Sequence, residues 1–71
     1  MRRLKQYKTS FVVPSDDEIR EGLEIAKQDN CVVRINYLIP YSGYYQLDIE
    51  PESTFEECYK RVHIVHIGSS E

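Results

Sequence analysis

The chain is poor in cysteine and glycine and has no long apolar run. Its 71 residues include two cysteines and three glycines. Two cysteines are too few for a disulfide-stapled secreted scaffold, so we expect a cytoplasmic protein with reduced thiols. The scattered glycines form no phosphate-binding loop. No apolar run approaches the roughly 20 residues that cross a membrane. These absences argue against secreted, nucleotide-binding and membrane-embedded proteins.

A catalytic signature is also missing. A chain of this size buries only about 60% of the surface that its unfolded form exposes, which leaves no room for a cleft between two lobes. The sequence has no G-x-S-x-G nucleophile motif. The adjacent acids Asp16 and Asp17, and likewise Glu56 and Glu57, diverge around a helix instead of converging on a substrate. We therefore expect no enzymatic activity and no cofactor.

The charge is unevenly distributed along the chain. Four of the nine basic residues stand in the first eight positions, whereas all twelve acidic residues come later. We divide the chain into a basic N-terminal arm (1–5), a single domain (6–68) and a short polar tail (69–71). A body this acidic is not expected to bind a phosphate backbone. The basic arm nevertheless leaves a nucleic-acid-associated protein as an alternative.

Local patterns predict six elements. Ser15 and Glu18 match a capping box at the start of a helix. Two segments of alternating apolar and polar residues flank Gly43, which is typical of a β-hairpin with glycine at a positive φ. The predicted elements are a strand at 6–13, a helix at 15–30, strands at 31–39 and 44–50, a helix at 53–62 and a strand at 63–67.

The resulting order is β-α-β-β-α-β, which predicts an α+β fold. It resembles the ferredoxin-like arrangement, in which two helices cover one face of a four-stranded antiparallel sheet. Many unrelated functions share this fold, so the resemblance alone implies none of them.

A metal site is the first constellation to consider. Cys58, His63 and His66 have a C-x4-H-x2-H spacing, and Cys31 offers a fourth ligand. On a strand, however, the two histidines point to opposite faces because their separation is odd. Cys58 falls on the apolar stripe of its helix, where a cysteine usually serves as a small hydrophobic residue. We therefore expect no metal.

The segment IPYSGYYQ (39–46) gathers three tyrosines around the hairpin turn. Tyr45 is in phase with the apolar residues of its strand and is expected in the core, whereas Tyr44 is out of phase. Tyrosine provides a large contact area with few rotatable bonds, and serine adapts its hydrogen bonding. Tyr41, Ser42 and Tyr44 are therefore candidate partner-binding residues. The alternative is that the rings only brace the hairpin.

An acidic helix face is the second candidate surface. Asp17, Glu21 and Glu24 share one side of the helix at 15–30. Regularly spaced carboxylates can imitate a phosphate backbone, although a solvated outer face explains the same pattern.

These patterns together favour a small protein-binding module that acts as an inhibitor or regulator. A phage-encoded blocker of a host defence or repair enzyme is one familiar type. Two alternatives stay open beside it, namely a nucleic-acid-associated protein and a sponge or sensor that holds a small molecule between protomers. We expect a protein partner and no membrane, and the sequence leaves a homodimer open.

Overall fold

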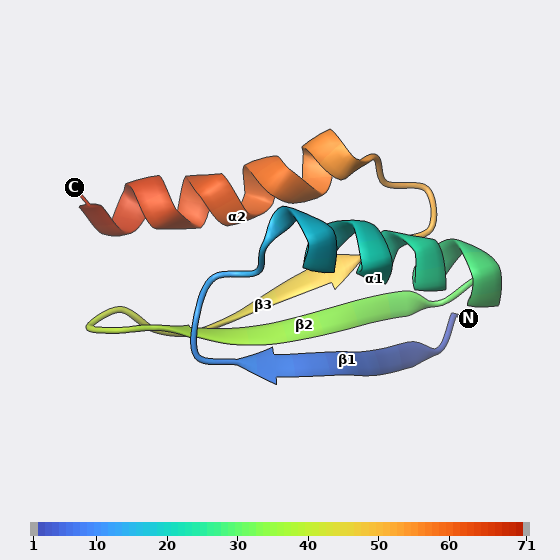
Figure 1. Ribbon diagram of the computed structural model, residues 1–71, viewed down its shortest axis with the longest axis horizontal. Helices are drawn as coiled ribbons and strands as arrows, with labels where there is room; N and C mark the ends of the chain where they lie inside the picture. Colours follow the sequence, from blue (N-terminus) through green and yellow to red (C-terminus); the bar gives the residue numbers. More distant parts are fainter. Residues whose placement is uncertain (1, 71) are drawn as a thin grey trace.

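Two helices cover one face of a three-stranded sheet, and the other face is open (Figure 1). The computed structural model describes the main chain of residues 2–70 and the side chains of residues 2–62. The elements, in chain order, are β1 (Leu4–Ser10), α1 (Asp16–Asp29), β2 (Val32–Ile39), β3 (Gly43–Ile49) and α2 (Phe55–Ser70). The α+β class and the placement of both helices on one side agree with the prediction.

Helix α1 begins and ends as its sequence predicts. The Ser15 hydroxyl accepts a hydrogen bond from the Glu18 amide at 3.3 Å, and the Glu18 carboxylate accepts one from the Ser15 amide at 2.9 Å. This reciprocal pair is a capping box, which satisfies two amides that the first turn leaves unpaired. The helix ends at Asp29, and the C-cap residue Asn30 has a φ of 50°, the left-handed conformation common at helix C-termini. The predicted helix is confirmed.

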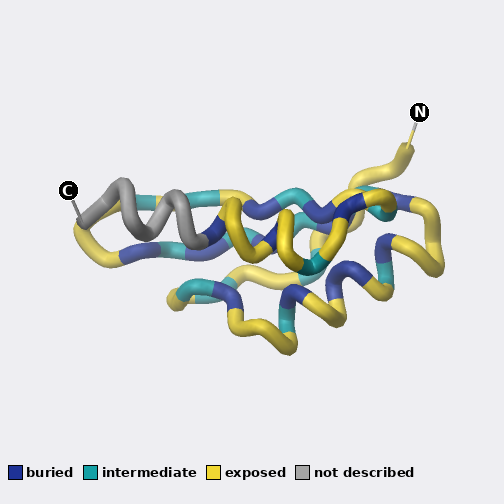
Figure 2. The backbone as a smooth tube through the Cα atoms, turned by 90° about the horizontal axis from the view of Figure 1, so that it is seen from above, coloured by how far each residue is buried: buried dark blue, intermediate teal, exposed yellow. Residues whose placement is uncertain are grey.

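The core lies between the helices and the central strand β2. Alternate residues of β2 are buried beneath the helices, as the alternation of dark blue and teal shows (Figure 2). The fully or nearly fully buried side chains of the sheet are Val33, Ile35, Tyr37, Ile39, Leu47 and Ile49. Burying one aliphatic side chain of this size stabilises the fold by about 1.5–3 kcal/mol. These six side chains form the sheet's side of the core.

Gly22 allows α1 to lie close to the sheet. A Cβ atom at this position would stand 2.8 Å from Cδ1 of Ile49. Glycine within a helix costs roughly 1 kcal/mol relative to alanine. The close packing of α1 on β3 offsets that cost.

The sheet is mixed, so the predicted antiparallel sheet is wrong. Strand β1 pairs with β2 in parallel, with Leu4 opposite Val32 and Ser10 opposite Tyr37. Strand β2 pairs with β3 antiparallel, as the hairpin requires. The parallel pair arises because α1 returns the chain to the start of the sheet, and the next strand is laid directly beside β1. The ferredoxin-like order instead separates these two strands.

The predicted strand at 63–67 is not observed, because α2 continues to Ser70. The helix begins at a capping box in which Thr54 and Glu57 bond reciprocally at 3.1 and 3.0 Å. Between that start and Gly68 the sequence has no glycine or proline that would end a helix. The three β-branched residues of this segment, Ile64, Val65 and Ile67, are too weak a signal to override a helix already formed. The sheet described thus has three strands, not four.

The first strand is also displaced from its prediction. It begins at Leu4, so two residues of the expected basic arm belong to the sheet, and it ends at Ser10. Phe11 and Val12, expected inside the strand, lie in the connection to α1 and are 69% and 64% exposed.

Candidate functional site

The hairpin tip has an unusual main-chain conformation. The Ser42 amide donates a hydrogen bond to the Ile39 carbonyl at 2.9 Å, which closes a turn with Pro40 and Tyr41 at its centre. Tyr41 has a φ of 71°. A positive φ at the second central position is normally supplied by glycine or asparagine, because a larger side chain crowds the main chain there. Gly43 has a φ of 114°, which confirms its predicted role.

The tyrosines of the hairpin face different surroundings. Tyr41 is fully exposed and Tyr44 is 68% exposed. Tyr45 is half-buried, with its ring centroid 5.9 Å from that of Tyr37 and its hydroxyl 3.4 Å from the Ser42 carbonyl oxygen. The predicted phase of Tyr44 and Tyr45 is confirmed, and the exposed tip stands at one end of the molecule (Figure 2).

Two further apolar side chains emerge at this end of the sheet. Strand β1 runs parallel to β2, so Phe11 and Val12 leave the sheet at the end where β2 enters the hairpin. We call Phe11, Val12, Tyr41 and Tyr44 the tip patch. Sequence reasoning missed the first two because Phe11-Val12-Val13 before a proline is a typical strand ending. Exposed apolar side chains scattered singly over a monomer are ordinary, whereas several at one end of a sheet are candidates for an interaction site.

The three residues of the predicted acidic helix face differ in their contacts. Asp17 pairs with Arg20 at 3.9 Å, and Glu21 accepts a hydrogen bond from the Tyr7 hydroxyl. That bond, reinforced by partial burial, raises the pKa of Tyr7 to about 12. Glu24 remains exposed on the same helix.

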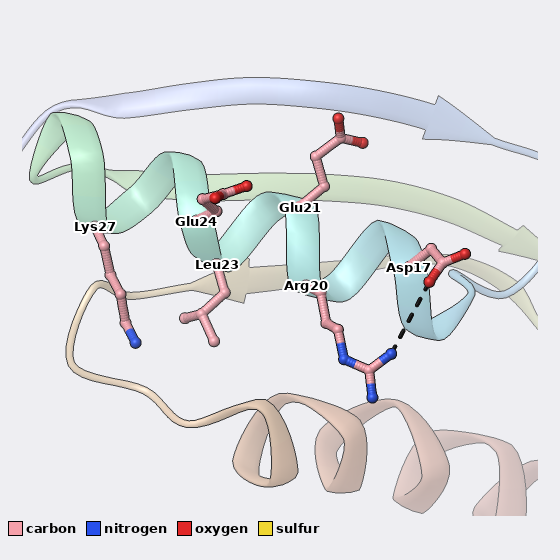
Figure 3. Close-up of a pocket in the computed structure, with 6 residues that line it drawn as sticks. All are labelled: Asp17, Arg20, Glu21, Leu23, Glu24 and Lys27. Atoms are coloured by element: carbon pink, nitrogen blue, oxygen red, sulfur yellow. Dashed lines mark ion pairs between the residues drawn. The ribbon is translucent and has the colours of Figure 1, made fainter.

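The side of α1 that faces α2 carries basic side chains. Arg20, Leu23 and Lys27 point toward α2, whereas Glu21 points toward β1 (Figure 3). The guanidinium of Arg20 lies 4.4 Å from the ring centroid of Phe55, a cation–π contact that joins the two helices. A shallow hollow of about 650 Å³ lies along these residues. Its mixed charge does not resemble the continuous negative surface of a nucleic acid.

The basic residues near the N-terminus are held within the fold. Arg2 pairs with Glu52, Lys5 with Asp29 at 3.3 Å, and Lys8 with Glu18. The bond from Lys8 is the main reason why the pKa of Glu18 lies below its ordinary value. These pairs reduce the positive charge that the arm presents to a phosphate backbone.

The open face of the sheet is polar at its centre. Arg34 donates two hydrogen bonds to Asp48, at 2.8 and 3.1 Å, which raise the pKa of the guanidinium. Asn36 donates to Gln6 at 2.7 Å. Since Arg34 is already paired with Asp48, its guanidinium is not free to bind a phosphate, which makes the centre of this face a poor surface for RNA.

Neither cysteine has the surroundings of a reactive thiol. Cys31 and Cys58 are free and buried, with exposed fractions of 2% and 0%. Burial is the main cause that raises the pKa of Cys58, which keeps it as a thiol at neutral pH. The predicted burial of Cys58 is confirmed.

The predicted absence of a metal concerns Cys31, Cys58, His63 and His66. Among the described residues, no group of three histidine, cysteine or acidic side chains is arranged to hold an ion. The side chains of His63 and His66 lie outside those residues. Both belong to α2, so the argument that a strand separates them no longer applies. The absence of a metal stays a prediction.

The fold and the tip patch define a small α+β protein with an open-faced mixed sheet. Searches against known protein families, curated proteins and solved structures find no match to this chain. In the part of the chain that the structure describes, neither helix has the length and apolar character needed to span a membrane.

Proposed function

We propose that this chain is a non-enzymatic protein-binding module, an inhibitor or regulator, that contacts a protein partner through its tyrosine hairpin tip. The single observation behind the proposal is Tyr41, which combines a φ of 71° with full exposure. For a residue other than glycine, a left-handed conformation costs on the order of 1–2 kcal/mol. Because the ring of Tyr41 is exposed, packing within the fold does not offset this conformational cost. A strained, solvent-exposed aromatic residue is therefore better explained by contact with a partner.

The chemistry of the tip suits a protein partner. Tyrosine is enriched among the residues that dominate protein–protein binding energies. Phe11 and Val12 extend the apolar contact at the same end of the sheet. The alternative of nucleic-acid binding has less support, because Arg2, Lys5 and Lys8 are each paired with a carboxylate. We also propose a cytoplasmic location, because both buried cysteines are free thiols.

The partner is sought by affinity capture from cell lysate with and without nuclease, followed by mass spectrometry. We expect a protein that is captured in both conditions by the native chain and lost with the Tyr41→Gly variant. Glycine relieves the strained turn, so this variant should unfold at a higher temperature while it binds at least about thirtyfold more weakly. A gain in stability together with a loss of binding separates a contact residue from a structural one.

Tyr59→Ala provides the aromatic control. Tyr59 lies on α2, is 43% exposed and stacks on Phe55 with centroids 6.0 Å apart. This variant should bind normally. Capture that disappears with nuclease, or equal binding by the native chain and the Tyr41→Gly variant, would contradict the proposal.

A further inference from the structure

The two outer strands of the sheet differ in how their free edges are protected. Strand β1 carries Lys5 and Lys8 and has an irregularity between Gln6 and Lys8. Edge lysines and bulges are the features with which proteins prevent an edge strand from pairing with another chain. Strand β3 has no lysine, no proline and an unbroken register with β2. Its one charge, Asp48, is already paired with Arg34.

The main-chain groups on the free edge of β3 can be assigned. In an antiparallel pair, residues alternate between those that bond to the neighbouring strand and those whose amide and carbonyl groups point away. The Asp48 carbonyl accepts a hydrogen bond from Arg61 of α2 at 3.0 Å, so Asp48 belongs to the outward set. By the same alternation Tyr44 and Gln46 are outward as well. Among residues 2–70, no other strand pairs with this edge.

We propose that β3 pairs with β3 of a second copy of this chain, antiparallel and about a two-fold axis at Gln46. This would join two three-stranded sheets into one continuous sheet. The proposal rests on the outer edge of the strand and not on the proposed function, and Tyr44 is the one residue common to this edge and the tip patch.

The sequence of β3 is compatible with itself in this register. Tyr45 of one chain lies opposite Leu47 of the other, which pairs two apolar side chains on the helix side of the sheet. Tyr44 lies opposite Asp48 on the open side, and the two Gln46 amides face each other. No like charges meet, whereas an axis at Asp48 would place two carboxylates face to face. Outward-facing residues oppose one another throughout, as main-chain hydrogen bonding requires.

A groove of about 300 Å³ lies between β3 and α2, lined by Gln46, Leu47, Asp48, Glu50, Tyr37 and Arg61. A carbonyl oxygen has two lone pairs, so Asp48 can accept from Arg61 and from a partner amide together.

Sedimentation equilibrium of the full chain tests the pairing, and we expect a monomer–dimer equilibrium. Gln46→Lys places two lysines opposite each other at the axis, and it should raise the dissociation constant of the dimer by at least about tenfold. The matched control is Gln6→Lys, the same substitution on the other edge strand, which should leave the dissociation constant unchanged. Circular dichroism establishes that both variants fold.

Disulfide cross-linking tests the register. Under mild oxidation the Gln46→Cys variant should form a covalent dimer, since residues directly opposite in such a ladder have Cα atoms about 5.5 Å apart, within disulfide range. The Tyr44→Cys variant should not, because position 44 faces position 48. The native cysteines are buried and do not compete. A chain that is monomeric at every concentration, equal effects of Gln46→Lys and Gln6→Lys, or a monomer that pairs β3 only with another protein's peptide would each overturn the proposal.

Discussion

Strands β1 and β3 are the two edges of one sheet, yet different chemistry holds them to the helices. The side chains of β1 reach α1 through polar contacts, which are Lys5 with Asp29, Tyr7 with Glu21 and Lys8 with Glu18. Those of β3 reach the helices through buried apolar groups, with exposed fractions of 2% for Leu47 and 0% for Ile49.

The difference implies unequal contributions to stability. Exposed ion pairs are typically worth no more than about 1 kcal/mol each, because water and salt screen them. Buried aliphatic side chains are worth several times as much. Strand β3 therefore anchors the fold, whereas β1 is the edge expected to open first. The strand with the larger share of the core is also the one that carries the exposed tip.

The largest expected effect is on the free energy of unfolding and comes from a change on β3. Ile49→Ala removes a fully buried side chain next to Gly22, and it should lower the free energy of unfolding by about 2–5 kcal/mol. For a domain of this size that loss approaches the whole stability. Urea denaturation followed by circular dichroism measures it. Lys8→Ala on β1 is the counterpart and should cost less than about 1 kcal/mol. Equal losses from the two variants would refute the contrast between the edges.

The second prediction compares two neighbours on β3. Tyr45→Ala removes a half-buried ring packed on Tyr37 and should cost about 2 kcal/mol, less than Ile49→Ala because the ring is only partly buried. Tyr44→Ala should cost less than about 1 kcal/mol, since its ring is 68% exposed. Thermal melts of both variants decide the matter. If Tyr44→Ala melts at as low a temperature as Tyr45→Ala, the assignment of Tyr45 to the core side of β3 and of Tyr44 to the open side is wrong.

The sequence predicted those features that depend on neighbouring residues. The capping box at Ser15 and Glu18, the alternation of β2 and the positive φ of Gly43 are all local consequences of residue type and spacing. The exposure of Tyr44 followed from the same alternation.

The failures concern information that local patterns do not contain. Which strand lies beside β1 depends on how the chain returns after α1, and an antiparallel order was wrongly preferred. The end of α2 is not predicted correctly, because a short segment rich in β-branched residues, such as 63–67, is compatible with a strand or a helix. The positive φ of Tyr41 had no signal at all, since tyrosine is not a residue typical of that conformation.

The smallest expected effect on stability concerns the contact between Lys8 of β1 and Glu18 of α1, and it depends on pH. The bonds from Lys8 and Ser15 lower the pKa of Glu18 in the folded protein. A carboxyl group with a lowered folded pKa stabilises the fold above its unfolded pKa of about 4.3, and that stabilisation is lost as the pH falls through the lower, folded value. Glu18→Gln keeps an acceptor for the Ser15 amide and removes only the charge. We therefore expect it to cost less than about 1 kcal/mol at pH 7.

The difference in melting temperature between the native chain and Glu18→Gln should shrink as the pH falls below about 4.3, and it should also shrink in high salt, which screens the pair with Lys8. Glu24→Gln is the matched control, because Glu24 lies on the same helix and forms no ion pair among the side chains of residues 2–62. The effect of Glu24→Gln should not depend on the Lys8 side chain, whereas the effect of Glu18→Gln should become smaller in a Lys8→Ala background, where only the bonds with Ser15 still lower the pKa of Glu18. A Glu18→Gln effect that is unchanged without Lys8 would mean that the capping box alone, and no ion pair to β1, accounts for the role of Glu18. Strand β1 would then be joined to α1 by fewer than the three polar contacts that distinguish it from β3.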